Sequence, residues 1–450
     1  MPEAKDIDDS LEFLRYFEKY AQNPDFGALV QEKVSADQKR LDLRGNQIKE
    51  EEFKLLSEID PLSGLTSLNL DQTGLASPGL KHLVLGNIFS RLQSLSLANN
   101  NLDDEGIFYL SKCSRLSRLE ELNLSSNEIG TLGAKVLFMA TTLDRLKNLN
   151  LSYNRIEPLG IKALSDSPQK NRIKALNLRD TSLGDDGMKQ LAKHVQMDQL
   201  EELDLSDNSI TCSGMEALAP SRPFPNLKRL VLNNNHIGDD GMYALAGSEA
   251  FSSVEELEII NNSLTTDSAI SLGKSKTLTR LKALDMNNND IRAEGTRALA
   301  QSANMQGMER LDLGENKLGP EGAQALAESP HFSRLRSLRL NNNNIADRGV
   351  IAIAKSMTLT RLESLFLENE NWIHAPGTRA IAESESLSSL RTLVLSLNVI
   401  GDEGARCLAN SQMLSGLVNL NVAGNKLSPS GEDALMKSTT LVNMKLLEIV

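Results

Sequence analysis

The side chains that most often carry catalysis or bind metals are sparse in this chain and lie far apart. Its 450 residues include five histidines and three cysteines, and none of these pairs with another at a CxxC, CxxH or HxxxH spacing. They are His82, His194, His236, His331, His374, Cys113, Cys212 and Cys407. No GxSxG, HExxH, phosphate-loop or dinucleotide-binding motif occurs. The sequence therefore predicts no metal site, no cofactor and no enzymatic activity.

Acidic side chains, in contrast, recur at fixed intervals in the middle of the chain. The set consists of Glu202, Asp204, Glu256, Glu258, Asp285 and Asp312, and Arg229 and Arg310 interrupt it. A row of carboxylates on one surface creates a negative potential that attracts a basic protein or peptide. The same pattern also fits an ordinary solvated surface, so the sequence leaves both interpretations open.

The interval between these residues is the period of an internal repeat, which must position them. The frame LxxLxLxxNxI returns fifteen times, and every step is 27 residues except one of 28. Its second leucine stands at positions 41, 68, 95, 122, 149, 176, 203, 230, 257, 284, 311, 338, 365, 393 and 420. Each copy begins with a short run of period two, which predicts a strand, and continues with a GxxxLA segment of helical spacing.

One strand and one helix per copy predict parallel strands with the helices on the opposite side. A single copy cannot bury its own leucines, but stacked copies share one continuous core. Paired strands lie about 4.8 Å apart, whereas packed helices lie roughly 8–10 Å apart. We therefore expect an α/β fold, a right-handed horseshoe with a concave parallel sheet and convex helices.

This frame resembles that of the leucine-rich repeat family over about residues 35 to 450. The LxxLxLxxN strand followed by GxxxLAxS, as in GPEGAQALAESPHF (319–332), is similar to the ribonuclease-inhibitor-like subclass. That subclass includes the activator of the Ran GTPase and many bacterial proteins. Uniform copies of 27 residues look more like runs in bacterial proteins than like the mammalian inhibitor. The resemblance implies a solenoid and says little about function.

Two residues of the frame are expected to be structural. The asparagine that follows each strand should bond to its own turn and to the neighbouring copy, because backbone amides are exposed there. The glycine that opens each GxxxLA segment should permit a tight start of the helix. GDDG at 184–187 and 238–241 is this same helix start and not a phosphate loop.

The segment ENENWIHAPG (368–377) holds the only tryptophan of the chain and the single extra residue of the repeat. Counting back from Gly377 places Trp372 in a slot that other copies fill with solvent-facing residues, and places the insertion within Glu368–Glu370. The sequence therefore predicts an exposed Trp372 at the rim beside Phe366, with Val394 and Leu397 nearby, as a contact site. The alternative is that Trp372 is buried in place of Ile373.

The two ends of the solenoid need caps, since an open stack would expose core leucines. Residues 1–34 are expected to form an N-terminal helical cap, with a helix over 8–23 that begins after Ser10. Residues 35–450 form the solenoid, and LVNMKLLEIV (441–450) begins a truncated sixteenth strand that serves as the C-terminal cap. No catalytic domain is expected to be appended.

The charge balance indicates the class of partner. There are 48 basic and 60 acidic residues, so the net charge is −12, which argues against nucleic acid and against an anionic membrane surface. Neither a secretory signal nor an apolar run of the ~20 residues needed for a membrane helix occurs. Sparse cysteines fit a reducing compartment. We expect a cytoplasmic, monomeric protein, with delivery into a host cell as an open variant.

The leading functional hypothesis is a non-catalytic scaffold that holds a protein partner, with a basic one favoured, in its concave face. The alternative from another class is regulation of an enzyme such as a small GTPase, as the resemblance to the Ran GTPase activator implies. That family's acidic tail is absent here, and its functional arginine and asparagine match no motif in this chain. Self-assembly through exposed ends or edges is a third hypothesis.

Overall fold

The computed structural model describes residues 24–221 and 224–449, which divide into two compact units. Unit 1 comprises residues 24–208 and 224–226, and unit 2 comprises residues 209–221 and 227–449. The helix predicted over residues 8–23 lies outside the described residues.

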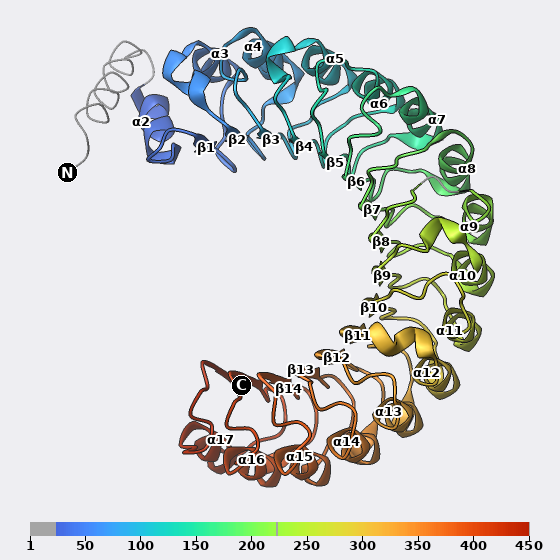
Figure 1. Ribbon diagram of the computed structural model, residues 1–450. Helices are drawn as coiled ribbons and strands as arrows, with labels where there is room; N and C mark the ends of the chain where they lie inside the picture. Colours follow the sequence, from blue (N-terminus) through green and yellow to red (C-terminus); the bar gives the residue numbers. More distant parts are fainter. Residues whose placement is uncertain (1–23, 222–223, 450) are drawn as a thin grey trace. The chain divides into compact units, whose positions relative to one another are not determined.

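Unit 1 alternates strands and helices, and each strand pairs in parallel with the next one along the chain. Its strands are β1 (Arg40–Asp42), β2 (Ser67–Asn69), β3 (Ser94–Ser96), β4 (Glu121–Asn123), β5 (Asn148–Asn150), β6 (Ala175–Asn177) and β7 (Glu202–Asp204). Its helices are α2 (Pro24–Lys33), α3 (Glu50–Glu58), α4 (Ala76–Leu85), α5 (Asp104–Lys112), α6 (Thr131–Phe138), α7 (Glu157–Lys162) and α8 (Gly184–His194), with 3-10 turns η1 (Asp60–Gly64), η2 (Ser114–Leu116) and η3 (Ala163–Asp166). The strands lie on the inner side of the unit and the helices on its outer side (Figure 1).

Unit 2 repeats the same alternation, again with parallel strands in chain order. Its strands are β8 (Arg229–Val231), β9 (Glu256–Glu258), β10 (Ala283–Asp285), β11 (Arg310–Asp312), β12 (Ser337–Arg339), β13 (Ser364–Phe366), β14 (Thr392–Val394), β15 (Asn419–Asn421) and β16 (Leu446–Glu448). Its helices are α9 (Cys212–Leu218), α10 (Gly238–Gly247), α11 (Thr266–Gly273), α12 (Arg292–Ala300), α13 (Gly319–Ala327), α14 (Ala346–Ala354), α15 (Ala375–Ala382), α16 (Gly401–Ala409) and α17 (Pro429–Met436), with 3-10 turns η4 (Glu249–Phe251) and η5 (Ala303–Gly307).

The core of each unit lies between the strand layer and the helix layer. The central leucine of a strand and the residue two positions later point toward the helices, because side chains alternate along a strand. Leu284 of β10 and Met286 beyond it are 2% and 0% exposed. Leu299 of α12 is 0% exposed on the opposite layer. The two residues that flank each central leucine therefore face away from the core.

The asparagine after the strand has the structural role predicted for it. Asn100 is fully buried, and its side-chain oxygen accepts hydrogen bonds from the backbone N–H groups of Thr73 (3.0 Å) and Leu75 (3.1 Å) in the preceding copy. Its side-chain nitrogen donates to the carbonyl oxygen of Leu70 at 2.7 Å. One amide thus satisfies backbone groups that neither a strand nor a helix would pair.

The glycines of the GxxxLA segments have a different role from the one expected. Gly106 and Gly349 lie within the first turn of their helices, and neither has a positive φ. A Cβ on Gly106 would lie 2.5 Å from the Ser77 hydroxyl of the preceding helix, and one on Gly349 would lie 2.9 Å from the Cβ of Ala323. These glycines therefore allow neighbouring helices to approach each other. The strained start of the helix falls elsewhere, as at Gly184 (φ 53°), the first residue of α8.

The ends of the described chain agree with the repeat. Phe26 and Val30 of α2 are buried, and Val34 forms an antiparallel bridge with Leu41 of β1. The sequence analysis did not foresee α2 as a separate helix within residues 1–34. The predicted sixteenth strand is present as β16, which pairs in parallel with β15. The capping role of both segments stays a prediction.

Candidate functional site

The residues on either side of each central leucine form a surface that the helices do not cover. In unit 2 one row of this surface consists of Val231, Glu258, Asp285, Asp312, Arg339, Phe366 and Val394, each paired in register with the next. We call this surface of β8–β14 the strand-lined face. The predicted adjacency of Glu258, Asp285 and Asp312 is confirmed, whereas Glu202 and Asp204 belong to β7 of unit 1.

Arginines pair with most carboxylates of the strand-lined face. Arg229 lies 2.6 Å from Glu258 and 3.8 Å from Glu256, and Arg310 lies 2.8 Å from the other oxygen of Glu256. The two arginines were expected to interrupt an acidic row. Instead they partly neutralise it, because each contacts a carboxylate on a neighbouring strand or on the next strand but one.

Arg339 is the central residue that the sequence analysis missed. Its guanidinium lies 3.1 Å from Asp312 and 3.0 Å from Glu368, and its Cζ lies 4.0 Å from the centre of the Phe366 ring. This is a cation–π contact reinforced by two ion pairs. The signal was present, since Arg339 stands 27 residues after Asp312 in the same row. Phe366 is therefore covered by Arg339 and is not an open apolar surface.

Asp285 is the carboxylate of this face that no ion pair reaches within the described residues. It accepts one hydrogen bond, from the backbone N–H of Asn287 at 3.0 Å. Burial, and then repulsion from Asp312 on the neighbouring strand, raise its pKa to about 7. Asp285 lines a pocket of about 200 Å³ together with Glu258, Arg310 and Asp312. A cationic side chain that entered this pocket would find an uncompensated acceptor.

The insertion before Trp372 changes the path of the chain after β13. Asn369 (φ 58°), Glu370 (φ 48°) and Trp372 (φ 55°) all adopt left-handed conformations. The backbone N–H of Asn342 is shared between the carbonyl oxygens of Glu368 (3.0 Å) and Asn369 (2.9 Å). The extra residue thus bulges the turn where the sequence analysis placed it.

The bulge leaves Trp372 at the surface, as predicted. Its side chain is 52% exposed, whereas Ile373 and Asn371 are fully buried in the positions that the frame assigns to them. The alternative of a buried tryptophan is therefore wrong. Asn371 keeps the ladder intact, because its side-chain oxygen accepts from the backbone N–H of Asn343 at 3.0 Å.

Trp372 shares a pocket of about 520 Å³ with Leu397, and we call it the Trp372 pocket. Its other lining residues are Asn342, Asn369, Glu370, Asn398, Val399, Gly424 and Lys426. Leu397 is 59% exposed and packs over Gly424. Trp372 and Leu397 are thus brought together as predicted. Phe366 does not line the pocket, which corrects the expectation that the tryptophan lies beside it.

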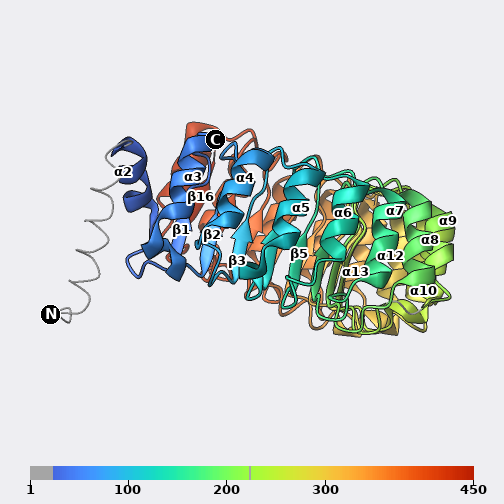
Figure 2. The ribbon, with the colours of Figure 1, turned by 90° about the horizontal axis from the view of Figure 1, so that it is seen from above.

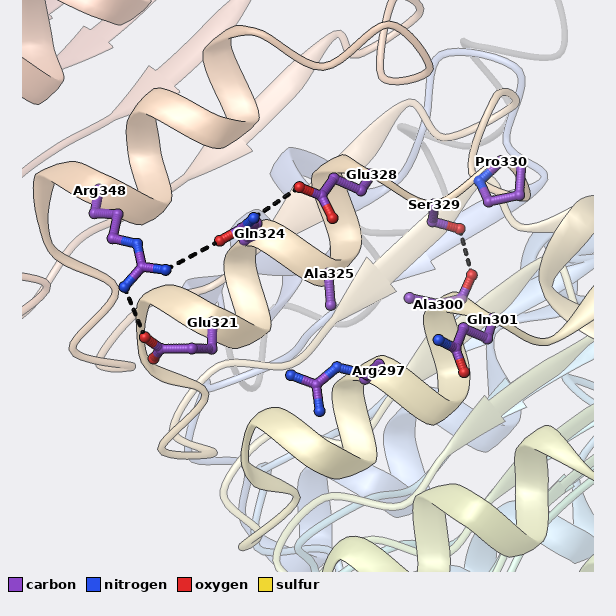
Figure 3. A pocket seen from close by; sticks show the side chains of 10 residues that line it. All are labelled: Arg297, Ala300, Gln301, Glu321, Gln324, Ala325, Glu328, Ser329, Pro330 and Arg348. Atoms are coloured by element: carbon purple, nitrogen blue, oxygen red, sulfur yellow. Dashed lines mark hydrogen bonds and ion pairs between the residues drawn. The ribbon is translucent and has the colours of Figure 1, made fainter.

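A further hollow lies on the outer side of unit 2 between α12 and α13 (Figure 3). Most of its polar side chains bond to each other: Arg348 pairs with Glu321 at 3.0 Å, and Gln324 donates to Glu328 at 2.7 Å. The hollow contains no nucleophile paired with a base. No group of metal-binding side chains occurs among the described residues, and no helix described here is long and apolar enough to span a membrane.

Comparison with known families agrees with this architecture. The family model described as Leucine Rich repeat matches residues 91–111, 117–138, 146–165, 171–192, 200–219, 225–246, 277–300, 306–327, 334–354 and 386–409. The chain belongs to the leucine-rich repeat family. Its parallel strands and covering helices are the solenoid architecture of that family, whose members generally act as binding scaffolds. No curated protein matches the sequence of this leucine-rich repeat protein.

Solved structures show the same fold. The TLR13–ssRNA13 complex is 22% identical with a TM-score of 0.57, over 91% of this chain and 52% of that chain. This leucine-rich repeat protein thus spans about half the length of TLR13. An internalin from Listeria monocytogenes is 21% identical (TM-score 0.47, 94% of this chain and 93% of that one). A leucine-rich repeat protein from Leptospira interrogans is also 21% identical (TM-score 0.48, 90% and 94%).

Proposed function

We propose that this leucine-rich repeat protein is a non-catalytic scaffold that binds a basic segment of a partner protein on the strand-lined face of unit 2. Trp372 and Leu397 anchor the partner by apolar contact. The observation that carries the proposal is the one-residue insertion after β13, which departs from an otherwise regular repeat and leaves a large aromatic ring half exposed. A solenoid does not need such a departure for its own stability.

The chemistry of the site supports both parts of the proposal. Tryptophan is enriched among the residues that dominate protein interfaces, because it buries a large area at a small cost in conformational entropy. The carboxylate of Asp285 has no cationic partner among the described residues, and Glu368 has one buried oxygen without a hydrogen bond there. A lysine or arginine from a partner would supply the missing positive charge.

Fluorescence of Trp372 tests the site directly, since it is the only tryptophan in the chain. In the free protein its emission should be quenched readily by acrylamide. Partner proteins recovered by affinity capture and then purified should protect it from quenching. Trp372→Ala combined with Leu397→Ala should weaken binding at least tenfold, about 1.4 kcal/mol, and leave thermal unfolding unchanged.

Met357 provides the matched control, because it is 88% exposed in unit 2 and lines neither the strand-lined face nor the Trp372 pocket. Met357→Ala should bind the partner normally. A partner that leaves Trp372 fully open to acrylamide would show that the contact lies elsewhere. Tight binding of a single-stranded RNA at this face would also contradict the proposal, because Glu256, Glu258, Asp285 and Asp312 line its pocket.

A further inference from the structure

The outer side of four consecutive helices in unit 1 presents a surface that the proposed function does not use. Figure 2 shows α4, α5, α6 and α7 standing side by side on that side of the unit. Each helix exposes the residues at spacing i, i+3 and i+7, which share one helical face. They are Pro78, Lys81 and Leu85; Glu105, Phe108 and Lys112; Leu132, Lys135 and Met139; and Leu159, Lys162 and Asp166. We call this set the α4–α7 outer face.

Large apolar side chains are unusually exposed on this face. Leu85 is 71% exposed, and Leu132 and Leu159 are both 67% exposed. Phe108 and Met139 are 48% and 47% exposed. Leu132 and Leu159 occupy the same position on helices that pack against each other, so they form a pair. Contiguous exposed apolar side chains of this kind mark interaction surfaces, whereas isolated ones do not.

The repeat itself does not require apolar residues at these positions. The corresponding residues on α12 to α16 of unit 2 are Glu294, Arg297, Gln301, Glu321, Gln324, Glu328, Arg348, Ile351, Lys355, Pro376, Arg379, Glu383, Glu403, Arg406 and Asn410. Nearly all of them are charged or polar, although both sets of helices pack on their sheets in the same way. The apolar residues of unit 1 therefore cannot be explained by the needs of the solenoid.

The charge of the α4–α7 outer face is opposite to that of the chain. It carries four lysines and two acids, whereas the whole chain has a net charge of −12. No ion pair involves Lys81, Lys112, Lys135 or Lys162 within the described ranges. Lys81 Nζ lies 5.4 Å from the centre of the Tyr109 ring, and Lys112 Nζ lies 5.6 Å from that of Phe108. Their positive charge is thus held among apolar groups and available to a carboxylate.

We infer that the α4–α7 outer face is a second interaction surface, which binds an acidic amphipathic segment of a partner protein. Apolar side chains of that segment pack against Leu132, Leu159 and Phe108, and its carboxylates pair with the lysines between them. An anionic membrane is the other surface with matching chemistry. The net charge of −12 opposes it, because the rest of the chain would be repelled.

Photocrosslinking tests this inference at one residue of each kind. Phe108 is replaced by p-benzoylphenylalanine in the full chain, and the control carries the same replacement at Ile351, the corresponding position on α14. After irradiation in cell extract, crosslinked segments are identified by mass spectrometry. We expect Phe108 to yield a defined segment in which Asp and Glu outnumber Lys and Arg. Lys112→Glu with Lys135→Glu should lower the yield at least tenfold.

The possible outcomes separate this surface from the one in unit 2. Trp372→Ala should leave the Phe108 crosslink unchanged, so failure of either site does not affect the other. A yield no higher than that of Ile351, a crosslinked segment with excess basic residues, or a crosslink to a second copy of the chain would overturn the inference. Cosedimentation of the protein with phosphatidylserine–phosphatidylcholine vesicles, lost in the double lysine variant, would identify a membrane as the occupant and would also overturn it.

Discussion

Asp285 shows how neighbouring strands change the chemistry of a single side chain. Its register partner Asp312 is also acidic, and Arg339, the next residue in the row, pairs with Asp312 at 3.1 Å. Asp285 is thus left with burial, a like charge beside it and one backbone hydrogen bond. Each of the first two effects favours the protonated form, so its pKa rises to about 7.

Asp285→Asn is therefore expected to stabilise the protein at high pH. The ordinary pKa of 3.8 applies to the unfolded chain, and the folded value is about 7. Between these values the unfolded chain loses the proton while the folded chain keeps it, so stability falls as pH rises from 4 to 7. Asparagine removes this penalty and keeps the oxygen that accepts from Asn287. The free energy of unfolding at pH 8 should increase by at least about 1 kcal/mol, roughly the value of one pKa unit.

Chemical denaturation at pH 3.5 and pH 8 measures this effect. The difference between variant and parent should disappear at pH 3.5, where both forms of Asp285 are protonated. Asp267→Asn, on the exposed surface of α11, serves as the control and should show no such dependence. An equal gain at both pH values would mean that packing, and not ionisation, distinguishes the variant.

At the scale of the element, the turn after β13 separates what the repeat needs from what binding needs. Removing Glu370 would restore the frame, because Leu367, Glu368, Asn369 and Asn371 then read LxxN. The deletion also removes a non-glycine residue with φ 48°, a conformation that costs about 1–2 kcal/mol. We expect the free energy of unfolding to stay the same or to rise by about 1 kcal/mol.

The same deletion should weaken partner binding at the Trp372 pocket. Glu370 lines that pocket, and Asn369 lies in the bulge that disappears. Thermal unfolding and the acrylamide quenching of Trp372, with and without a captured partner, report the two effects separately. If deletion of Glu370 unfolds the protein, the bulge is required by the solenoid and its link to binding is lost.

At the scale of the whole molecule, the features that could be predicted are those that every copy shares. The strand positions follow from the central leucines, the ladder follows from the asparagines, and the exposure of Trp372 follows from counting the frame on both sides of an insertion. Stacking imposes all three, so a single sequence suffices to find them.

Features that depend on side-chain contacts between copies could not be predicted in the same way. The row position of Arg339 is readable from its spacing, but its choice of Asp312, Glu368 and Phe366 as partners depends on side-chain conformation. The isolation of Asp285 follows from that choice. The glycines of the GxxxLA segments likewise acquire their role only when two helices are placed side by side, as at Gly106 and Ser77.

A solenoid held together by contacts between successive copies should respond locally to damage, and Asn316 tests this. Asn316 is fully buried, donates to the carbonyl oxygens of Met286 (2.9 Å) and Gly314 (2.8 Å), and accepts from the N–H of Ile291. Asn316→Ala leaves these groups unpaired at a cost of about 1–3 kcal/mol. Hydrogen exchange should accelerate in β10 to β12 and their turns but not in β1 to β5, because helices and strands contact the next ones along the chain. Gln324→Ala, on the surface of the same copy, should change neither region. Uniform acceleration through both units would show instead that the chain unfolds as one cooperative body.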